Sequence, residues 1–299
     1  MDKFHLIKVF VAVVDTGGFA GAARHLHMSP PAVTRAINEL ESQLGVRLLT
    51  RTTRIVRVTE PGDRYAQDYR RILADMADAD ESVASMHGAP RGRLVLSAPV
   101  LFGARYVTAI VTEYLQRYPQ VSVSCWVLGR LVHMMEEGVD VAIRIADLPD
   151  SSMQAVRVGQ VRRVICAAPS YLQRKGIPLI PDDLHGHCTI AVGSPLPALD
   201  WRLMDKGVPR VVKLQPRLTT NGNESAIAAA LNGFGLTRVI SYQVADYLRD
   251  GRLKTVLTEF EPPALPVHVV HREGRHASRK ARAFIDLAIE RLRANPALN

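Results

Sequence analysis

Residues 29–44, S-P-P-A-V-T-R-A-I-N-E-L-E-S-Q-L, predict an amphipathic helix. Ser29 suits the N-cap, and the prolines after it, Pro30 and Pro31, fit a first turn, where a missing N–H costs nothing. One face carries apolar residues at helical spacing: Val33, Ile37, Leu40 and Leu44. The other face carries side chains of the kinds that reach phosphates and base edges in a major groove: Pro31, Thr34, Arg35 and Asn38. An ordinary solvent-facing helix explains that polar face too, so this helix alone leaves both interpretations open.

The preceding residues favour the first interpretation. Residues 4–14 have an apolar helical pattern that Gly17 and Gly18 end, and residues 19–26 form a short second helix rich in small side chains. A short turn at residues 27–28 leads into Ser29. Helix, short helix, turn and helix in this order predict a helix-turn-helix arrangement.

A basic β wing is expected after the third helix. Gly45 ends that helix, and residues 46–58 contain two short extended runs joined by R-T-T-R at 51–54. Four arginines lie here without an acidic residue among them: Arg47, Arg51, Arg54 and Arg57. Such a segment suits contact with a phosphate backbone. Without the preceding helices, the same sequence would be explained equally well by a basic loop exposed to solvent.

Composition limits the classes of function. The 299 residues are enough for two or three domains, and a net charge of +9 favours a polyanionic partner. The three cysteines are widely spaced, which argues against a disulfide framework or a zinc module. Residues 185–188, H-G-H-C, are explained equally well by a surface loop, so we expect no metal site there. We expect no cofactor, and no Ser, His and acid set can be singled out as catalytic, because sequence order alone does not specify one. Without a ~20-residue apolar run or a signal peptide, we expect a soluble, cytoplasmic protein.

A long helix is predicted over residues 60–88, with Thr59 as its cap. Its apolar residues alternate steps of four and three, the narrow seam of a helix that packs on another helix. A helix packed on its own domain is the alternative, but such helices usually have a wider apolar stripe. We therefore expect homodimerisation through Tyr65, Tyr69, Ile72, Met76, Ala79, Val83 and Met86.

The rest of the chain predicts an α/β fold. After a hinge at residues 89–93, strands expected at 94–98, 121–127 and 139–145 alternate with helices at 102–117 and 131–137. A second unit starts near residue 161, and a strand at 267–271 and a helix at 277–292 end the chain. Strands and helices that take turns imply a layered domain with a mostly parallel sheet.

Residues 19–62 resemble the winged helix-turn-helix of LysR-type bacterial transcriptional regulators. The similarity is long and ungapped and includes A-A-R-H-L-H-M-S-P-P-A-V-T-R-A-I-N-E-L-E-S-Q-L-G-V-R-L-L-T-R-T-T-R and V-T-E-P-G. Residues 136–152 and 251–257 are also typical of that family. The resemblance implies that Pro31, Thr34 and Arg35 meet DNA and that the wing touches the flanking groove or backbone. The DNA-binding residues expected are Ser29, Pro30, Pro31, Thr34, Arg35, Asn38, Arg51, Thr52 and Arg54.

The resemblance also implies the domain plan. Residues 1–59 would be an all-α winged helix-turn-helix, residues 60–88 a dimerisation helix, and residues 94–299 an effector domain of two Rossmann-like lobes similar to type 2 periplasmic binding proteins. Lobe I would take residues 94–160 and 267–299, and lobe II residues 161–266. The macromolecular partners implied are double-stranded promoter DNA, RNA polymerase and further copies of the chain, which form a homodimer or a homotetramer. The resemblance does not imply a membrane.

A small-molecule site is expected between the lobes. Ser97 ends a strand that feeds a helix, and free N–H groups at a helix start suit an anion, although Ser97 as a simple cap fits equally from local sequence. Arg144 is a cation in an apolar strand, so it either pairs with an acid or faces the cleft. The family's use of the turn after Ser97 favours a site for a small carboxylate. The residues expected there are Ser97, Pro99, Val100, Arg144, Asn221 and Thr237.

These features predict a ligand-responsive, DNA-binding transcriptional regulator. Two alternatives stay beside it. An enzyme would need a convergent acid, base or nucleophile set, which the sequence does not identify. A ligand-independent DNA-binding regulator would have the same first 60 residues and a vestigial cleft.

Overall fold

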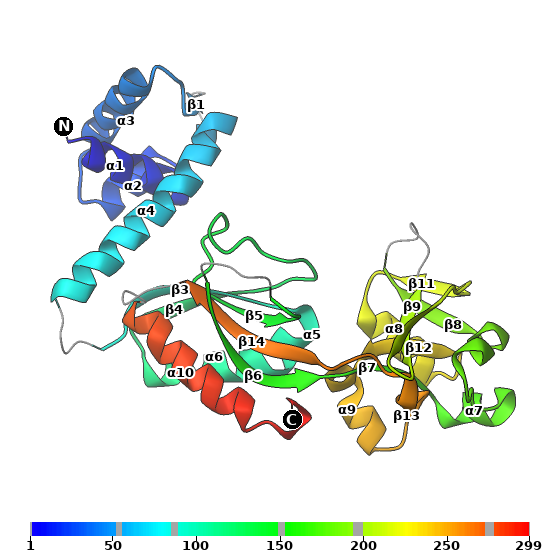
Figure 1. The fold of residues 1–299 in the computed structure, drawn as a ribbon. Helices are drawn as coiled ribbons and strands as arrows, with labels where there is room; N and C mark the ends of the chain where they lie inside the picture. The colour runs from blue at the N-terminus through cyan, green and yellow to red at the C-terminus, as the bar shows by residue number, and fades with distance from the viewer. Residues whose placement is uncertain are drawn as a thin grey trace. The chain divides into compact units, whose positions relative to one another are not determined.

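The computed structural model describes residues 2–51, 56–84, 89–148, 153–193, 200–272 and 278–298. The chain forms two compact units, Met1–Gly88 and Ala89–Asn299 (Figure 1). Among the described residues no single helix is long and apolar enough to cross a membrane, and only the sharply bent pair α1 and α2 passes that test of length and composition when taken together.

The first unit is a small helical bundle with a two-stranded wing. Three helices pack around a buried core that includes Leu6, Phe10, Val33 and Leu40, and Gly45, at φ +67°, ends the third helix. The fourth helix runs alongside the other three and extends past them (Figure 1). The elements are α1 (Lys3–Asp15), α2 (Phe19–His25), α3 (Pro30–Leu44), β1 (Leu49–Arg51), β2 (Val56–Val58) and α4 (Glu60–Ala84).

A buried carboxylate ties the wing to α3. Glu41 is 6% exposed, and its Oε1 accepts hydrogen bonds from the backbone N–H groups of Leu48 at 2.8 Å and Leu49 at 3.0 Å. The start of α4 approaches the same place, because Thr59 donates from its hydroxyl to the Leu48 carbonyl at 3.0 Å. Gly62 lies so close that a Cβ would be 2.1 Å from that carbonyl oxygen. The segment around Leu48 therefore joins α3, the wing and α4.

The second unit contains two mixed sheets, each with its own helices (Figure 1). Lobe I, as we call the part built on the first sheet, has the strand order β4-β3-β5-β14-β6. Helices α6 and α10 cover the face of this sheet that contains Leu96, Ile143 and Val267. The elements of lobe I are β3 (Gly92–Ala98), α5 (Val100–Phe102), a π-type turn (Gly103–Val107), α6 (Thr108–Arg117), β4 (Val121–Val127), β5 (Val141–Ile145), β6 (Met153–Val161), β14 (Leu265–Arg272) and α10 (Arg279–Arg293).

Lobe II is built on the second sheet, with the order β11-β8-β12-β7-β13. One face packs against Trp201, Leu203 and Tyr171, and the other packs against α8 and Val244 of α9. Its elements are β7 (Arg163–Ala167), α7 (Pro169–Lys175), β8 (Thr189–Val192), the hairpin β9 (Trp201–Asp205) and β10 (Val208–Val212), β11 (Leu218–Thr220), α8 (Asn223–Leu231), β12 (Leu236–Ile240), α9 (Ser241–Arg249) and β13 (Lys254–Val256).

Two expectations about the second unit are wrong. The sheets are mixed rather than mostly parallel, because the chain crosses from β6 into β7 and returns through β14, and each crossing strand then meets its neighbours antiparallel. Residues 131–137 form no helix, and the turn there covers residues 134–138. There the Glu137 carboxylate accepts from the backbone N–H of His133 at 3.0 Å and from Arg130 at 2.8 Å, which fixes a turn that Gly138 ends at φ +65°.

Replacement of Glu41 by Ala should destabilise the first unit. Two buried N–H groups would lose a charged acceptor, which costs about 2–4 kcal/mol of unfolding free energy. Urea unfolding followed by far-UV circular dichroism measures this, because both tryptophans, Trp126 and Trp201, lie in the second unit. Glu39→Ala, on the same helix, is the control and should change stability by less than about 0.5 kcal/mol. Equal stability of the two variants would contradict the role of Glu41.

Candidate DNA-contact helix and ligand cavity

The polar face of α3 points away from the core of the first unit. Val33, Ala36 and Ile37 are fully buried, whereas Arg35 and Asn38, on the opposite face of the helix, are exposed. Ser29, Pro30 and Pro31 are exposed at the start of the helix, and Thr34 is half-buried with its hydroxyl donating to the Pro30 carbonyl at 3.1 Å. Ser29 occupies the N-cap by its backbone, but its side chain makes no capping bond. The face expected to meet DNA is therefore open along its length.

Arg35 is the strongest anion-seeking group on that face. In the described part of the chain its guanidinium has no carboxylate within ion-pair distance. Asn38, one turn further, has an interaction within the protein. Guanidinium forks are suited to phosphate or to the O6 and N7 atoms of guanine, so this position can read a base or hold the backbone.

The wing is described only in part. β1 and β2 pair antiparallel with Thr50 opposite Arg57 and the backbone of Arg51 opposite that of Val56. Thr52 and Arg54, both expected to contact DNA, lie outside the described residues. Arg57 is exposed, and Arg47 lies 3.5 Å from the Glu41 carboxylate. Arg47 therefore pairs with the carboxylate that joins the wing to α3.

The seam of α4 divides into two parts. Tyr65 and Tyr69 pack on the core of the first unit, and Tyr65 meets Phe10 edge-on at 5.7 Å between ring centroids. Ile72 and Met76 are 38% and 42% exposed. The side chains of Ala79 and Val83, and all of Met86, lie outside what the structure describes. The apolar surface left for another helix therefore starts at Ile72.

An ion pair fixes the direction of α4. Arg70 donates from Nε to the Asp15 carboxylate at 2.7 Å, and its Nη2 lies 2.6 Å from the same oxygen. Asp15 is the last residue of α1. Together with the two tyrosines, this pair holds the first half of α4 on the helical bundle.

In lobe I, Ser97 and Arg144 lie on the same face of the sheet. Ser97 of β3 pairs with Ala142 of β5, and Arg144 follows two residues later. Alternate residues of a strand share a face, so both side chains lie opposite the face that α6 and α10 cover. Ser97 is 7% exposed. The sheet thus brings a hydroxyl and a guanidinium, 47 residues apart in sequence, to neighbouring strands.

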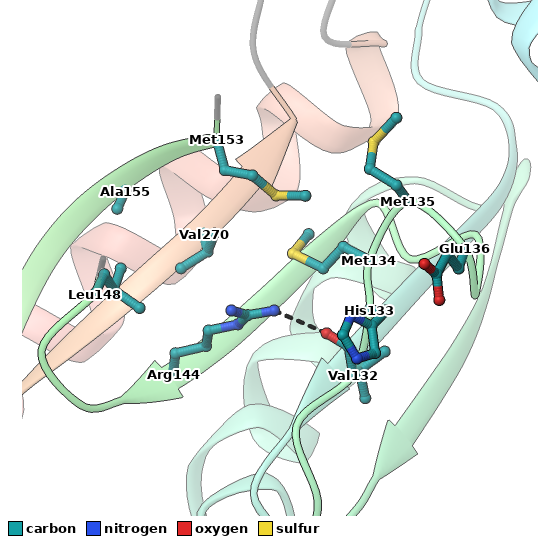
Figure 2. Close-up of a pocket in the computed structure, with 10 residues that line it drawn as sticks. All are labelled: Val132, His133, Met134, Met135, Glu136, Arg144, Leu148, Met153, Ala155 and Val270. Carbon is teal, nitrogen blue, oxygen red and sulfur yellow. Dashed lines mark hydrogen bonds between the residues drawn. The ribbon is translucent and has the colours of Figure 1, made fainter. Parts of the chain in front are cut away.

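Arg144 borders a cavity of about 380 Å³ within lobe I (Figure 2). Its Nη2 donates to the carbonyl of Val132 at 2.8 Å, which orients the guanidinium along one wall. The rest of the wall is largely apolar, with Met134, Met153 and Val270 around the same space and Glu136 and His133 on its far side. Methionine walls adapt to the shape of a ligand, and a guanidinium with remaining donors orients an anion. The cavity therefore suits a small anionic molecule with an apolar body.

Of the expected effector residues only Arg144 lines this cavity, and Ser97 and the others do not. Pro99 caps α5, and Val100, its first residue, is 42% exposed. Asn221 is exposed between β11 and α8 in lobe II. Thr237 is fully buried in lobe II, and its hydroxyl donates to the Ile190 carbonyl at 3.3 Å. A hydrogen bond donated by Thr237 to a carboxylate would need that bond to break.

The turn after Ser97 leads directly into the contact between the lobes. Phe102 of α5 packs edge-on against Tyr242 of α9 at 5.2 Å between centroids. Arg105, three residues on, donates to the backbone carbonyls of Tyr242 at 3.0 Å and Gln243 at 3.2 Å and pairs with Asp246. Sequence reasoning did not identify Arg105, Tyr242 or the methionines of the cavity. The sequence H-M-M-E at residues 133–136 is the signal that could have indicated the cavity wall.

An exposed polar helix in a helix-turn-helix unit, joined to a two-lobed α/β unit with a ligand-sized cavity, defines a DNA-binding protein with a ligand-binding part. Comparison with known families agrees. Residues 4–63 match the model of the bacterial regulatory helix-turn-helix protein, lysR family, and residues 87–293 match the LysR substrate binding domain.

Individual relatives extend over the whole chain. An HTH-type transcriptional regulator of Xanthomonas campestris is 31% identical over 95% of this chain and 84% of its own. The regulator CrgA of Neisseria meningitidis is 30% identical over 97% of each chain. The solved structure of CrgA, a LysR-type transcriptional regulator, covers 97% of this chain and 99% of its own with a TM-score of 0.62 at 29% identity. Full-length AphB, a virulence activator of Vibrio cholerae, gives 0.63 at 26% identity over 96% and 98%.

The chain belongs to the LysR family of bacterial transcriptional regulators. It is therefore a DNA-binding regulator with an effector-binding domain, and the enzyme alternative is set aside because the family consists of regulators.

Arg35→Ala should weaken specific DNA binding by about 1–3 kcal/mol if the side chain reads a base, and leave nonspecific binding nearly unchanged. Fluorescence anisotropy with the DNA upstream of the protein's own gene and with a scrambled duplex, at one salt concentration, separates the two. Arg117→Ala removes the same charge from α6 of the second unit and should bind as the wild type does. An equal loss on both duplexes would make Arg35 a backbone contact, and no loss on either would remove it from the interface.

Proposed function

We propose that the protein binds a dyad-related promoter site as a homodimer or a dimer of dimers and responds to a small carboxylate. The observation that carries the proposal is the open polar face of α3, with Arg35 exposed and without a carboxylate partner among the described residues. A dimer presents two such helices, and their separation sets the spacing of two half-sites.

The dimer contact proposed is the outer part of α4. Ile72 and Met76 lie one turn apart and are exposed, whereas the tyrosines before them are used inside the first unit. Two large apolar side chains on one exposed helix face are stabilised by burial against another helix. The narrow apolar period that runs on toward residue 86 supports the same contact.

Ile72→Glu together with Met76→Glu should give monomers, because two charges would be buried in the contact without partners. Sedimentation velocity at micromolar concentration measures the state. Gln67→Glu adds a charge to an exposed position of α4 outside this seam and should leave the oligomer intact. A double variant that stays dimeric would place the contact elsewhere.

The effector proposed is a small carboxylate with an apolar body, for example an aromatic ring. Ser97 and Arg144 share a sheet face, and the cavity beside Arg144 offers a cation and an apolar wall. A ligand shifts the protein only by as much as it binds one conformation better than another. Since α5 leads from the Ser97 turn to Phe102 and Arg105 at the contact between lobes, a ligand near this turn has a short route to the arrangement of the lobes. The separation of the two recognition helices, and hence DNA bending, would follow.

Ser97→Ala and Arg144→Ala should each abolish the response to effector and leave DNA affinity within about twofold, because both side chains lie in the second unit. The measurement is effector-dependent anisotropy on the promoter fragment. Arg117→Ala, in the same lobe but on α6, is the matched control and should respond normally. A normal response in both site variants would move the effector site away from this sheet face.

The experiment that tests the whole proposal is a DNase footprint on the DNA upstream of the protein's own gene, repeated with a panel of small carboxylates. We expect protection with dyad symmetry that shortens or shifts with one compound. Protection that no compound changes would favour the ligand-independent regulator. No protection at all would overturn the promoter assignment.

A further inference from the structure

Three arginines of lobe II form a second cationic cluster, which we call the β7–β12 arginine cluster. Arg163 lies on β7, Arg238 on β12 and Arg202 on β9. In the register of the two sheet strands, Arg238 is opposite Ile165 and Arg163 is opposite Ile240. Diagonal neighbours of this kind lie on one face with Cα atoms about 7–8 Å apart.

The cluster sits at the edge of a buried core. Ile165 and Leu236, on the same sheet face, belong to the core that Trp201 of β9 helps to cover. Arg238 and Arg163 are half-buried, and Arg202, next to Trp201, is exposed. Two guanidinium groups are thus partly removed from water, and the exposed Arg202 belongs to the hairpin whose Trp201 packs on the same core.

No carboxylate compensates these charges in the described part of the chain. None of the three arginines lies within ion-pair distance of an Asp or Glu there. Glu261 is engaged by Arg162 at 2.7 Å, and Asp182 and Asp205 are engaged by Arg210 at 2.5 Å and 3.3 Å. Arg162 and Arg210 therefore have acidic partners, and the three arginines of the cluster have none among the described residues.

The guanidinium of Arg238 is the least well compensated of the three. Its Nε is buried and has no hydrogen-bond partner among the described residues. Burial, together with the positive charges of Arg163 and Arg202, lowers the pKa of Arg238 to about 10. A buried charge normally persists when something compensates it, and an uncompensated one is destabilising.

We propose that the β7–β12 arginine cluster binds a divalent oxyanion, such as a phosphate or sulfate group, as a ligand site separate from the effector site. Guanidinium N–H groups match the oxygens of such anions in bidentate geometry, and several cations favour a double negative charge over a single one. The residues of the cluster belong to lobe II, whereas Ser97, Arg144 and the cavity beside Arg144 belong to lobe I. The proposal therefore does not depend on the identity of the effector.

Thermal unfolding of the full chain tests the site with inorganic phosphate and sulfate as probes. Intrinsic fluorescence reports on the second unit, because Trp126 and Trp201 both lie there. Low-millimolar phosphate or sulfate should raise the Tm of the wild type by about 2–5 °C above a NaCl control of equal ionic strength. The increase should saturate, which separates binding from the general effect of these salts at high concentration.

Arg238→Met keeps the length of the side chain and removes its charge. We expect the variant to lose the anion-dependent increase and to have a higher Tm than the wild type without anion. Arg202→Gln, at an exposed position where folding is not at risk, should raise the anion concentration at half-effect at least threefold. Arg210→Met is the matched control on β10: it breaks two ion pairs, so it should lower the Tm and keep the anion response.

Two results would overturn the proposal. One is a wild type that responds to phosphate and sulfate no more than to NaCl. The other is an anion response that Arg238→Met and Arg202→Gln both retain in full. Neither result bears on the DNA footprint or on the effector variants, so this site and the proposed function fail independently.

Discussion

The Glu41 carboxylate is the interaction on which the DNA-facing part of the chain depends. It lies on the inner side of α3 and accepts hydrogen bonds from the backbone N–H groups of Leu48 and Leu49. The third helix and the wing are therefore held by the same side chain. Thr59 and Gly62 bring the start of α4 to the same Leu48 carbonyl. A shift of α4, such as a change in a dimer would cause, is therefore transmitted to the wing and to α3 through a few backbone atoms. The Glu41 carboxylate is buried, so it stabilises the fold only while both N–H groups donate to it. Loss of either hydrogen bond would leave a buried charge less well compensated.

The second unit has an equivalent junction between its lobes. Phe102 and Tyr106 pack with Tyr242, and Arg105 adds bonds to the start of α9. Aromatic packing tolerates a range of geometries, whereas the bonds of Arg105 to two successive carbonyls restrict the arrangement more closely. Only a few residues separate Ser97 from this junction, so the strand exit, where open α/β sheets bind ligands, is close in sequence to the contact between the lobes. A junction with two packings of similar energy is what a ligand can switch.

Much of this architecture could be predicted from sequence, and the exceptions have physical reasons. The helix-turn-helix followed from local signals: the apolar period of α3, its prolines and Gly45. The mixed sheets could not follow, because antiparallel pairing of β14 comes from the path of the chain between lobes and leaves no local pattern. The role of Glu41 could not be predicted, because the backbone N–H groups that it accepts lie seven and eight residues further along the chain. Thr237 looked available for a ligand, but a neighbouring strand uses its hydroxyl. The fit of these elements is tertiary, and periodicity cannot show it.

Arginine pairing separates structural cations from ligand-facing ones. Arg105, Arg162 and Arg210 each meet a carboxylate and link two elements, so their charges are consumed in holding the fold. Exposed arginines without a carboxylate are ordinary, because water solvates them. The informative class is a guanidinium that is partly removed from water and has no carboxylate within the described residues. Arg144 is one such case: it borders a cavity and has a carbonyl as its partner. Arg238, beside the half-buried Arg163, is another, with a buried Nε that has no hydrogen-bond partner in the same part of the chain. Desolvation without compensation raises the free energy of the empty state, so an anion at either place recovers energy that folding alone leaves unrecovered.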